Sequence, residues 1–127
     1  MILGIGTDVA SVSRIGASYQ RHGQRFLDRV YSPDEQAYCL RFHDPSERLA
    51  ARWAAKEAFL KALGSGLVGD ARLYEIEVLH DSQGAPQLRW SGAVEKQIAA
   101  LGPLHAWCSL SHAADLALAM VILERAN

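Results

Sequence analysis

RWAAKEAFLKALGSG, residues 52–66, is the most informative segment of this 127-residue chain. Its Ala-rich part contains no Gly or Pro before Gly64, which favours a continuous helix. Upstream, Asp44–Glu47 supplies an acidic N-cap, Pro at the first helical position and Glu three residues after the cap. Gly64 suits the left-handed residue that commonly ends a helix. We therefore predict one long helix that begins after Asp44 and ends at Leu63.

Glu57 is expected on an apolar face of this helix. At about 100° per residue, its neighbours on that face are Ala50, Trp53, Ala54, Leu60 and Lys61. A carboxylate among apolar side chains must be protonated, paired with a cation or bound to a metal. An i, i+4 pair with Lys61 and a metal site are therefore both open alternatives. Arg48, Arg52 and Lys56 form a separate stripe roughly opposite, which we interpret as the solvated face.

The N-terminal segment supplies a second carboxylate. Met1–Thr7 is short, apolar and interrupted by Gly, which predicts a strand that delivers Asp8 to its end. The glycines of GIGTD, residues 4–8, either accommodate close packing or let the backbone approach a ligand. If Asp8 and Glu57 converge, they supply two oxygen ligands, which Mg²⁺ accepts when phosphate oxygens and water complete its octahedron. Lys61 would then lie one helical turn from the metal and offset charge on a leaving phosphate.

Two further segments carry candidate chemistry. The backbone amides of residues 64–66 (GSG) could form an anion-binding nest after the helix. In SLSH, strand alternation places Ser109 and Ser111 on one face of a strand that ends at His112. This pattern fits either a Ser–His nucleophile pair or polar residues on the open face of a strand.

The remaining segments alternate between helix and strand signals. We predict helices over 11–31, in two pieces hinged near Gly23, and over 93–101, and strands over 74–79, 87–90, 106–110 and 116–123. The first two of these strands bracket a turn at residues 81–84 and should form a hairpin, whose second strand starts near Pro86. No linker or repeat interrupts the pattern, so we expect one α+β domain over residues 1–127.

Composition and charge exclude several classes of protein. Hydrophobic residues make up 50% of the chain and charged residues 21%, as in ordinary globular domains. The net charge of -1 argues against a generic nucleic-acid binder. The N-terminus does not resemble a secretory signal, and the longest apolar run, Leu116–Leu123, is too short to span a bilayer, so we expect a cytoplasmic protein with no membrane partner. Cys39 and Cys108 lie far apart and are interpreted as reduced packing residues.

A local basic patch contrasts with this near-neutral charge. Arg14, Arg21 and Arg25 would fall within about 20° of one line on a continuous helix. Only Asp28 opposes the four Arg residues between positions 14 and 29. The patch serves either solubility or the docking of an acidic partner protein.

Five motifs occur in one order along nearly the whole chain. They are GIGTDVASVSRI at 4–15, ARWAAKEAFLKALGSG at 51–66, GAP at 84–86, CSLSH at 108–112 and ALAMVILE at 117–124. Together they resemble the bacterial holo-acyl-carrier-protein synthases, which are small single-domain 4'-phosphopantetheinyl transferases. The resemblance implies that family's fold, an antiparallel-rich sheet packed against one long central helix, and a homotrimer with its active site between neighbouring subunits.

The resemblance also implies a reaction and a set of residues. The family transfers 4'-phosphopantetheine from coenzyme A to a serine of apo acyl carrier protein, releases adenosine 3',5'-bisphosphate and requires Mg²⁺; the product serves fatty-acid biosynthesis. Its acidic metal ligands match Asp8 and Glu57, and its catalytic or phosphate-binding lysine matches Lys61. The residues implied to lie near coenzyme A are Arg52, Lys56, Lys61, Gly64, Ser65, Gly66, Ser109, Ser111 and His112. Arg14, Arg21 and Arg25 would face the acidic helix of the carrier protein.

Some points stay open at this level. Either a metal-associated water or His112 could take the proton from the carrier serine. Many family members have His and then a small aliphatic residue where Trp107 and Cys108 stand here, and Phe where Trp53 stands. Two rival functions remain: a non-catalytic protein that binds coenzyme A or another nucleotide through Mg²⁺, and an interaction domain that docks an acidic helix.

Overall fold

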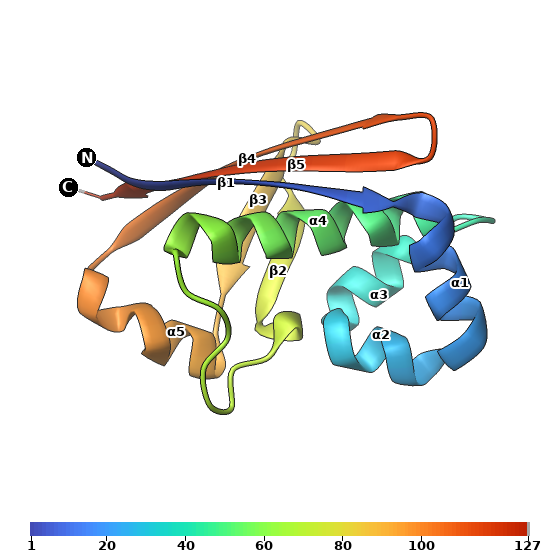
Figure 1. Cartoon of the computed structure of the whole chain (residues 1–127), viewed down its shortest axis with the longest axis horizontal. Helices are drawn as coiled ribbons and strands as arrows, with labels where there is room; N and C mark the ends of the chain where they lie inside the picture. Colours follow the sequence, from blue (N-terminus) through green and yellow to red (C-terminus); the bar gives the residue numbers. More distant parts are fainter. Residues whose placement is uncertain (127) are drawn as a thin grey trace.

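An antiparallel sheet packed on one face by a long helix forms the centre of the fold (Figure 1). The computed structural model describes residues 1–126. The three strands lie in the order β1 (Ile2–Ser11), β5 (Leu116–Arg125) and β4 (Leu104–Ala113). Helix α4 (Ser46–Leu63) runs beneath β1 and β5, and both termini lie at one end of the sheet. The α+β class and the antiparallel pairing are as predicted.

Two glycines of β1 allow the strand and helix α4 to approach closely. A Cβ atom at Gly4 would collide with the backbone carbonyl of Ala62, and one at Gly6 with that of Ala58. Because these are backbone atoms of a helix, they cannot move aside as a flexible side chain would. The structure therefore supports the packing interpretation of the two glycines, and not a close approach to a ligand.

The predicted boundaries of α4 are nearly correct. Pro45 is the N-cap, one residue later than the predicted Asp44, and the Asp44 carboxylate accepts a hydrogen bond from the Ser46 amide at 3.0 Å. The helix ends after Leu63, where Gly64 adopts the left-handed conformation with φ of 76°. Gly64 was predicted in this role because a side chain there would be strained.

Three short helices pack around the first half of α4. They are α1 (Val12–His22), α2 (Gln24–Val30) and α3 (Pro33–Cys39). The predicted hinge is confirmed at Gly23, whose φ is 56°. Helix α3 was not predicted, although Ser32 and Glu35 form a capping box around Pro33, which is a recognisable start signal.

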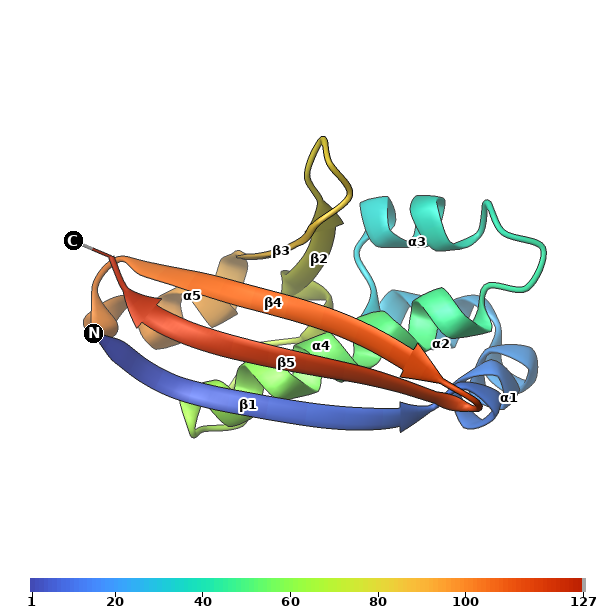
Figure 2. The same cartoon turned by 90° about the horizontal axis from the view of Figure 1, so that it is seen from above.

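The second half of the chain contains a hairpin and a short helix. Strands β2 (Ile76–His80) and β3 (Pro86–Trp90) pair antiparallel, as predicted, and α5 (Gly92–Ile98) leads back to β4. A 3₁₀ turn at Leu73–Glu75 replaces the predicted start of the first strand at Tyr74. Figure 2 shows the hairpin projecting beside β4, away from β1.

Strand β1 is longer than predicted. It continues through Asp8 to Ser11, because every residue from Gly4 onward pairs with β5 up to Ser11 opposite Leu116. Asp8 is therefore held within the strand, opposite Ala119, and not delivered at its end. As β1 forms an edge of the sheet, the Asp8 side chain is still accessible beside α4.

The interpretation of Arg48, Arg52 and Lys56 as a solvated face is wrong for two of the three residues. Arg52 is 2% exposed and Lys56 is 0% exposed. Helix α3 and strand β2 cover this side of α4, which local periodicity could not reveal because the covering elements come from distant sequence. Cations become tolerable there only because the covering elements supply hydrogen-bond acceptors.

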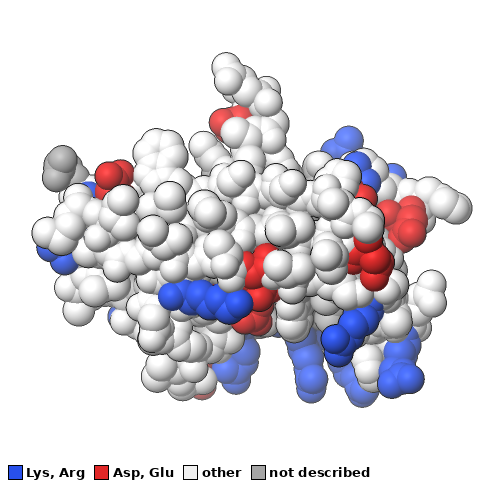
Figure 3. Space-filling model, turned by 45° about the horizontal axis from the view of Figure 1, so that its top comes forward, with Lys and Arg blue, Asp and Glu red and all other residues white. Residues whose placement is uncertain are grey.

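The other face of the sheet is apolar and uncovered. Along β5, the exposed residues Leu116, Leu118 and Met120 alternate with buried residues. Ile2, Ile5 and Val9 of β1 and Trp107 of β4 are also more than half exposed, and Ile122 of β5 lies on this face and is partly buried. Figure 3 shows few charged side chains over the middle of this face.

Within residues 1–126, no helix combines the length and hydropathy that crossing a bilayer requires.

Candidate active site

Asp8 and Lys61 meet at the edge of the sheet formed by β1. Lys61 Nζ lies 2.9 Å from Asp8 Oδ1 and donates a second hydrogen bond to the Thr7 carbonyl oxygen at 3.0 Å. Asp8 is 17% exposed at its side chain, whereas Lys61 is 55% exposed. The ammonium group therefore acts as a local counter-ion that reaches Asp8 from solvent, one helical turn beyond Glu57.

Glu57 is half-buried beside this pair. Burial raises the pKa of Glu57 above its ordinary value, the Asp8 carboxylate raises that pKa further, and the Lys61 ammonium opposes both. Among the ion pairs of the described residues there is none between Glu57 and Lys61, four positions apart on α4. Lys61 pairs with Asp8 instead. A cation bound between two such carboxylates would offset their mutual repulsion and favour their ionised forms.

The two carboxylates fit a divalent oxygen-ligand metal. No group of three or more His, Cys, Asp or Glu side chains suited to a metal occurs in the described part of the chain. An all-protein cage of the zinc kind is therefore not built there. Mg²⁺ commonly takes only one or two protein carboxylates and fills its other positions with water and substrate phosphates, which suits Asp8 and Glu57.

The segment from Gly64 to Gly66 follows Lys61 at the end of α4. It is exposed, and the Gly66 carbonyl oxygen accepts a hydrogen bond from Gln97 Nε2 at 2.8 Å. The Gly64 amide already donates to the carbonyls of Leu60 and Lys61 at 3.1 Å. The Gly64 amide is thus not free for an anion, so the predicted nest is reduced to the amides of Ser65 and Gly66.

A second site lies on the opposite side of α4, at the β4 edge. A hollow of about 160 Å³ there is lined by Tyr38, Glu47, Arg48, Ala51, Arg52, His80, Leu110, Ser111 and His112. Three of the residues implied to lie near coenzyme A, Arg52, Ser111 and His112, thus come together from α4 and β4. Two further lining residues were not singled out from the sequence: Tyr38 of α3 and His80 of β2.

Arg52 dominates the electrostatics of this hollow. Its guanidinium lies 4.4 Å from the centre of the Tyr38 ring, and one terminal nitrogen lies 3.3 Å from His80 Nδ1. Arg52 Nε is buried and has no hydrogen-bond partner among residues 1–126. Burial lowers the pKa of His80, and the Arg52 charge lowers it further. A buried cation with an unused donor indicates a site for an anionic ligand group.

His112 lies at the rim of this hollow, where its Nε2 is 3.7 Å from Glu47 Oε1. Asp8, Ala119 and Leu110 occupy one row across the sheet, so β5 separates Asp8 from the β4 edge. Two strand spacings amount to roughly 10 Å. The predicted catalytic residues are therefore divided within one chain: Asp8, Glu57 and Lys61 on one side, and His112 on the other.

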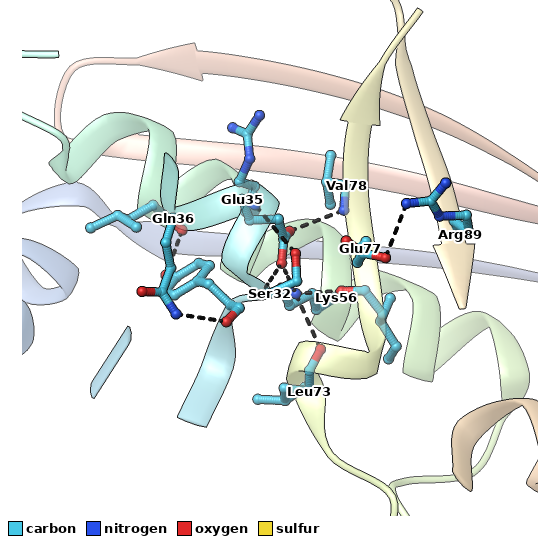
Figure 4. A network of polar contacts seen from close by, with 12 residues as sticks. Ser32, Glu35, Gln36, Lys56, Leu73, Glu77, Val78 and Arg89 are labelled. Carbon is cyan, nitrogen blue, oxygen red and sulfur yellow. Dashed lines mark hydrogen bonds and ion pairs between the residues drawn. The ribbon is translucent and has the colours of Figure 1, made fainter. Parts of the chain in front are cut away.

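Lys56 and Ser109 lie outside both sites. Lys56 is fully buried and forms an ion pair with Glu35 at 2.7 Å, so it has no surface with which to contact a coenzyme (Figure 4). Ser109 is exposed on the uncovered face of β4, opposite Met120. Sequence reasoning missed Glu35 and the ring of Tyr38, although the capping box that positions both residues on α3 was present in the sequence.

The three arginines of the basic patch are all exposed on α1 and α2. Arg14 and Arg21 line one hollow of about 550 Å³, and Arg25 lines a neighbouring hollow with His22 and Phe26. Arg14 also borders a hollow of about 330 Å³. Val9, Ile15, Phe26 and Trp53 are the large apolar residues that line this hollow. Because α1 ends at Gly23, the patch is formed by two helices and not by one continuous face.

Comparisons with known proteins identify the family. The sequence model of the 4'-phosphopantetheinyl transferase superfamily matches residues 4–121. A holo-acyl-carrier-protein synthase of Koribacter versatilis (strain Ellin345) is 44% identical over 124 residues, covering 98% of this chain and 99% of that protein. The crystal structure of the holo-acyl-carrier-protein synthase from Neisseria meningitidis superposes with a TM-score of 0.88 at 37% identity, covering 98% of this chain and 100% of that one.

A structure with a bound ligand is also similar. The Helicobacter pylori holo-acyl-carrier-protein synthase, solved in complex with coenzyme A, has a TM-score of 0.82 at 30% identity and covers 94% of this chain and 99% of that one. The family that the five motifs indicated is thereby confirmed. The chain belongs to the 4'-phosphopantetheinyl transferase superfamily, among the holo-acyl-carrier-protein synthases.

Proposed function

We propose that this enzyme transfers 4'-phosphopantetheine from coenzyme A to a serine of apo acyl carrier protein in a Mg²⁺-dependent reaction, in the cytoplasm and for fatty-acid biosynthesis. The observation that carries the proposal is the cluster of Asp8, Glu57 and Lys61 at the β1 edge. Two carboxylates and one lysine at an exposed edge are what binding and neutralising a pyrophosphate requires.

Each residue of the cluster has a distinct task. Asp8 and Glu57 hold Mg²⁺, which supplies charge neutralisation for the pyrophosphate when it is bound. Lys61 is half-exposed and donates to Asp8, so its ammonium can turn toward an incoming phosphate oxygen. By donating there, Lys61 stabilises negative charge that develops on the leaving phosphate. The carrier serine oxygen attacks the β-phosphorus while its hydroxyl proton passes to His112 or to a water, and the bond from the β-phosphorus to the bridging oxygen breaks, so that adenosine 3',5'-bisphosphate leaves.

The hollow at the β4 edge is proposed as the anion site for the nucleotide part of coenzyme A. Arg52 Nε is a buried donor that has no partner in the described part of the chain, and Arg48 lies beside Arg52 with its guanidinium over the Phe42 ring. His112 adds a side-chain donor from β4, and Ser111 lines the hollow from the same strand. A phosphate group would satisfy these donors in a partly dry environment, where charged hydrogen bonds are strong.

We further propose a homotrimer whose active sites lie between subunits. One argument is that the acidic cluster and the anion hollow lie at opposite edges of the sheet, so a neighbouring subunit that supplied one of them would bring both around one coenzyme A. The second argument is the uncovered apolar face of β1, β5 and β4, which a lone chain would leave in water.

A shared site predicts complementation between inactive subunits. Asp8→Asn and Arg52→Ala chains, each inactive alone, should regain transfer when they are unfolded and refolded together, because some interfaces then combine an intact Asp8 with an intact Arg52. Light scattering should give three times the 13.9 kDa chain mass, and Met120→Glu should reduce it to that of one chain. Absence of complementation, or a wild-type monomer that transfers at full rate, would contradict the shared site.

The basic patch is proposed to dock the acidic helix of the carrier protein. Charge reversal by Arg14→Glu together with Arg21→Glu should raise the carrier KM by roughly tenfold or more and leave the coenzyme A KM unchanged. Steady-state kinetics at varied ionic strength measure this, since the wild-type carrier KM should rise with salt. Arg72→Glu, an exposed arginine near the 3₁₀ turn, is the matched control. An unchanged carrier KM in the double variant argues against this docking surface.

The direct test of the function is the intact mass of the carrier. Apo acyl carrier protein is incubated with the enzyme, coenzyme A and Mg²⁺, with and without a chelator. We expect a gain of one phosphopantetheine group that the chelator abolishes. If a carrier accepted by another transferase gains nothing, the protein is either a coenzyme-binding protein or acts on a different carrier.

A further inference from the structure

The Lys56–Glu35 pair is the most deeply buried charged contact among residues 1–126, and the reaction proposed above does not use it. Both side chains are 0% exposed, and Lys56 Nζ lies 2.7 Å from Glu35 Oε1. Lys56 also donates to the carbonyl oxygens of Leu73, at 3.1 Å, and Ile76. Figure 4 shows Lys56 beside Glu35 and Leu73.

Glu35 uses its second oxygen to hold strand β2. Glu35 Oε2 accepts a hydrogen bond from the Val78 amide at 3.0 Å, while Oε1 accepts one from the Ser32 amide at 2.9 Å. The pair therefore joins three elements at one point: α4 through Lys56, α3 through Glu35 and β2 through Val78 (Figure 4).

The same three elements line the hollow around Arg52 together with β4. Arg52 precedes Lys56 by one turn of α4, Tyr38 follows Glu35 by about one turn of α3, and His80 follows Val78 by two residues of β2. The Arg52 guanidinium lies 4.4 Å from the centre of the Tyr38 ring, and one of its nitrogens lies 3.3 Å from His80 Nδ1. The centres of the Tyr38 and His80 rings are 5.3 Å apart. Helices α4 and α3 each supply one residue of the buried pair, and β2 supplies the Val78 amide that binds Glu35; each of the three elements also carries one member of the Arg52, Tyr38 and His80 group.

We propose that Lys56 and Glu35 are positioning residues, which set the relative placement of Arg52, Tyr38 and His80 and thereby the affinity for the nucleotide phosphate of coenzyme A. The inference rests on the proposed function of the Arg52 hollow. The family resemblance places Lys56 near coenzyme A. We infer that Lys56 affects coenzyme A binding indirectly, through its buried pair with Glu35.

A positioning role is separable from a purely stabilising one. Removing one partner leaves the other charge buried and unpaired, which is strongly destabilising, whereas replacing both partners by apolar side chains of similar volume is often neutral or stabilising. The double variant Lys56→Met with Glu35→Leu should therefore be more stable than Lys56→Met alone, although it leaves the amides of Ser32 and Val78 without their acceptor. It loses the hydrogen bond that fixes Val78, so β2 is no longer tied to α3.

The experiment compares four proteins: wild type, Lys56→Met, the apolar double variant and Phe59→Leu. Phe59 is a fully buried residue of α4 that contacts Trp90, away from the hollow, so its variant controls for lost stability alone. We expect the double variant to raise the coenzyme A KM by roughly tenfold to a hundredfold, as small misplacements of binding groups do, with the carrier KM unchanged. Phe59→Leu should lower the melting temperature and leave both KM values unchanged.

Two ligand readouts separate this inference from the proposed function. Binding of adenosine 3',5'-bisphosphate, measured by calorimetry, should weaken in the double variant by the same factor as the coenzyme A KM rises. In the ligand-free protein, the NMR signals of the His80 ring should shift, because its neighbour Arg52 is no longer aligned. If wild type transfers nothing but the His80 signals shift as expected, the proposed function fails and the positioning stands. A stable double variant with wild-type KM, wild-type bisphosphate affinity and unchanged His80 signals overturns the positioning role.

Discussion

Glu57→Gln is expected to abolish Mg²⁺-dependent transfer, with a loss in kcat of at least about 100-fold. Glu57 is half-buried next to Asp8, and its pKa is raised chiefly by burial and then by that neighbouring carboxylate. A neutral amide of the same shape removes the repulsion between the two carboxylates, so the metal-free variant should be as stable as the wild type or slightly more stable. The same change removes one oxygen anion from the metal site.

Thermal unfolding with and without Mg²⁺ distinguishes these effects. The wild type should gain stability as Mg²⁺ is added, since a ligand that binds only the folded state stabilises it, whereas Glu57→Gln should gain little. Glu95→Gln, an exposed carboxylate on α5, is the matched control and should behave as wild type. A Glu57→Gln enzyme with normal turnover and a normal response to Mg²⁺ would show that the metal is bound elsewhere.

Lys61→Met should cause the second-largest loss, roughly 100- to 1,000-fold in kcat, because one charged donor aimed at developing charge contributes on that scale. Its effect on the metal should be opposite to that of Glu57→Gln. In the metal-free protein Lys61 Nζ occupies one side of Asp8 at 2.9 Å, so its removal frees that carboxylate oxygen. Mg²⁺ should therefore stabilise the variant at least as much as it stabilises the wild type.

The comparison needs kcat and the Mg²⁺-induced shift in melting temperature from the same preparations. Lys96→Met, at an exposed lysine of α5, controls for the loss of one surface charge. If Lys61→Met instead loses the response to Mg²⁺ together with activity, then Lys61 organises the metal site and does not act on the phosphate. An unchanged kcat would remove Lys61 from the chemistry.

Local sequence signals predicted the elements that depend on local physics. The end of α4 at Gly64, the break at Gly23 and the hairpin before Pro86 follow from turn and capping preferences of single residues. The amphipathic pattern also identified Glu57 as an anion in apolar surroundings. The family resemblance then added the reaction and the roles of the remaining residues.

Other features depended on contacts between distant segments. Lys61 has Glu57 four residues away, yet it pairs with Asp8, because β1 is held against α4 by the close packing at Gly4 and Gly6. Local periodicity interpreted Lys56 as solvated, but α3 and β2 bury it, and its three acceptors come one each from α3, the 3₁₀ turn and β2. Such contacts carry no local signature.

The amino-acid order alone therefore determined the end of α4 at Gly64, the break at Gly23 and the hairpin, and which face of α4 carries an acid among apolar neighbours. Propensity, capping and periodicity act over a few residues, so they can be evaluated without knowing the fold. Only the tertiary structure decided that the acidic cluster and the Arg52 hollow lie at opposite edges of one sheet. Strand order and burial depend on which distant segments pack together, and that depends on the free energy of the whole chain.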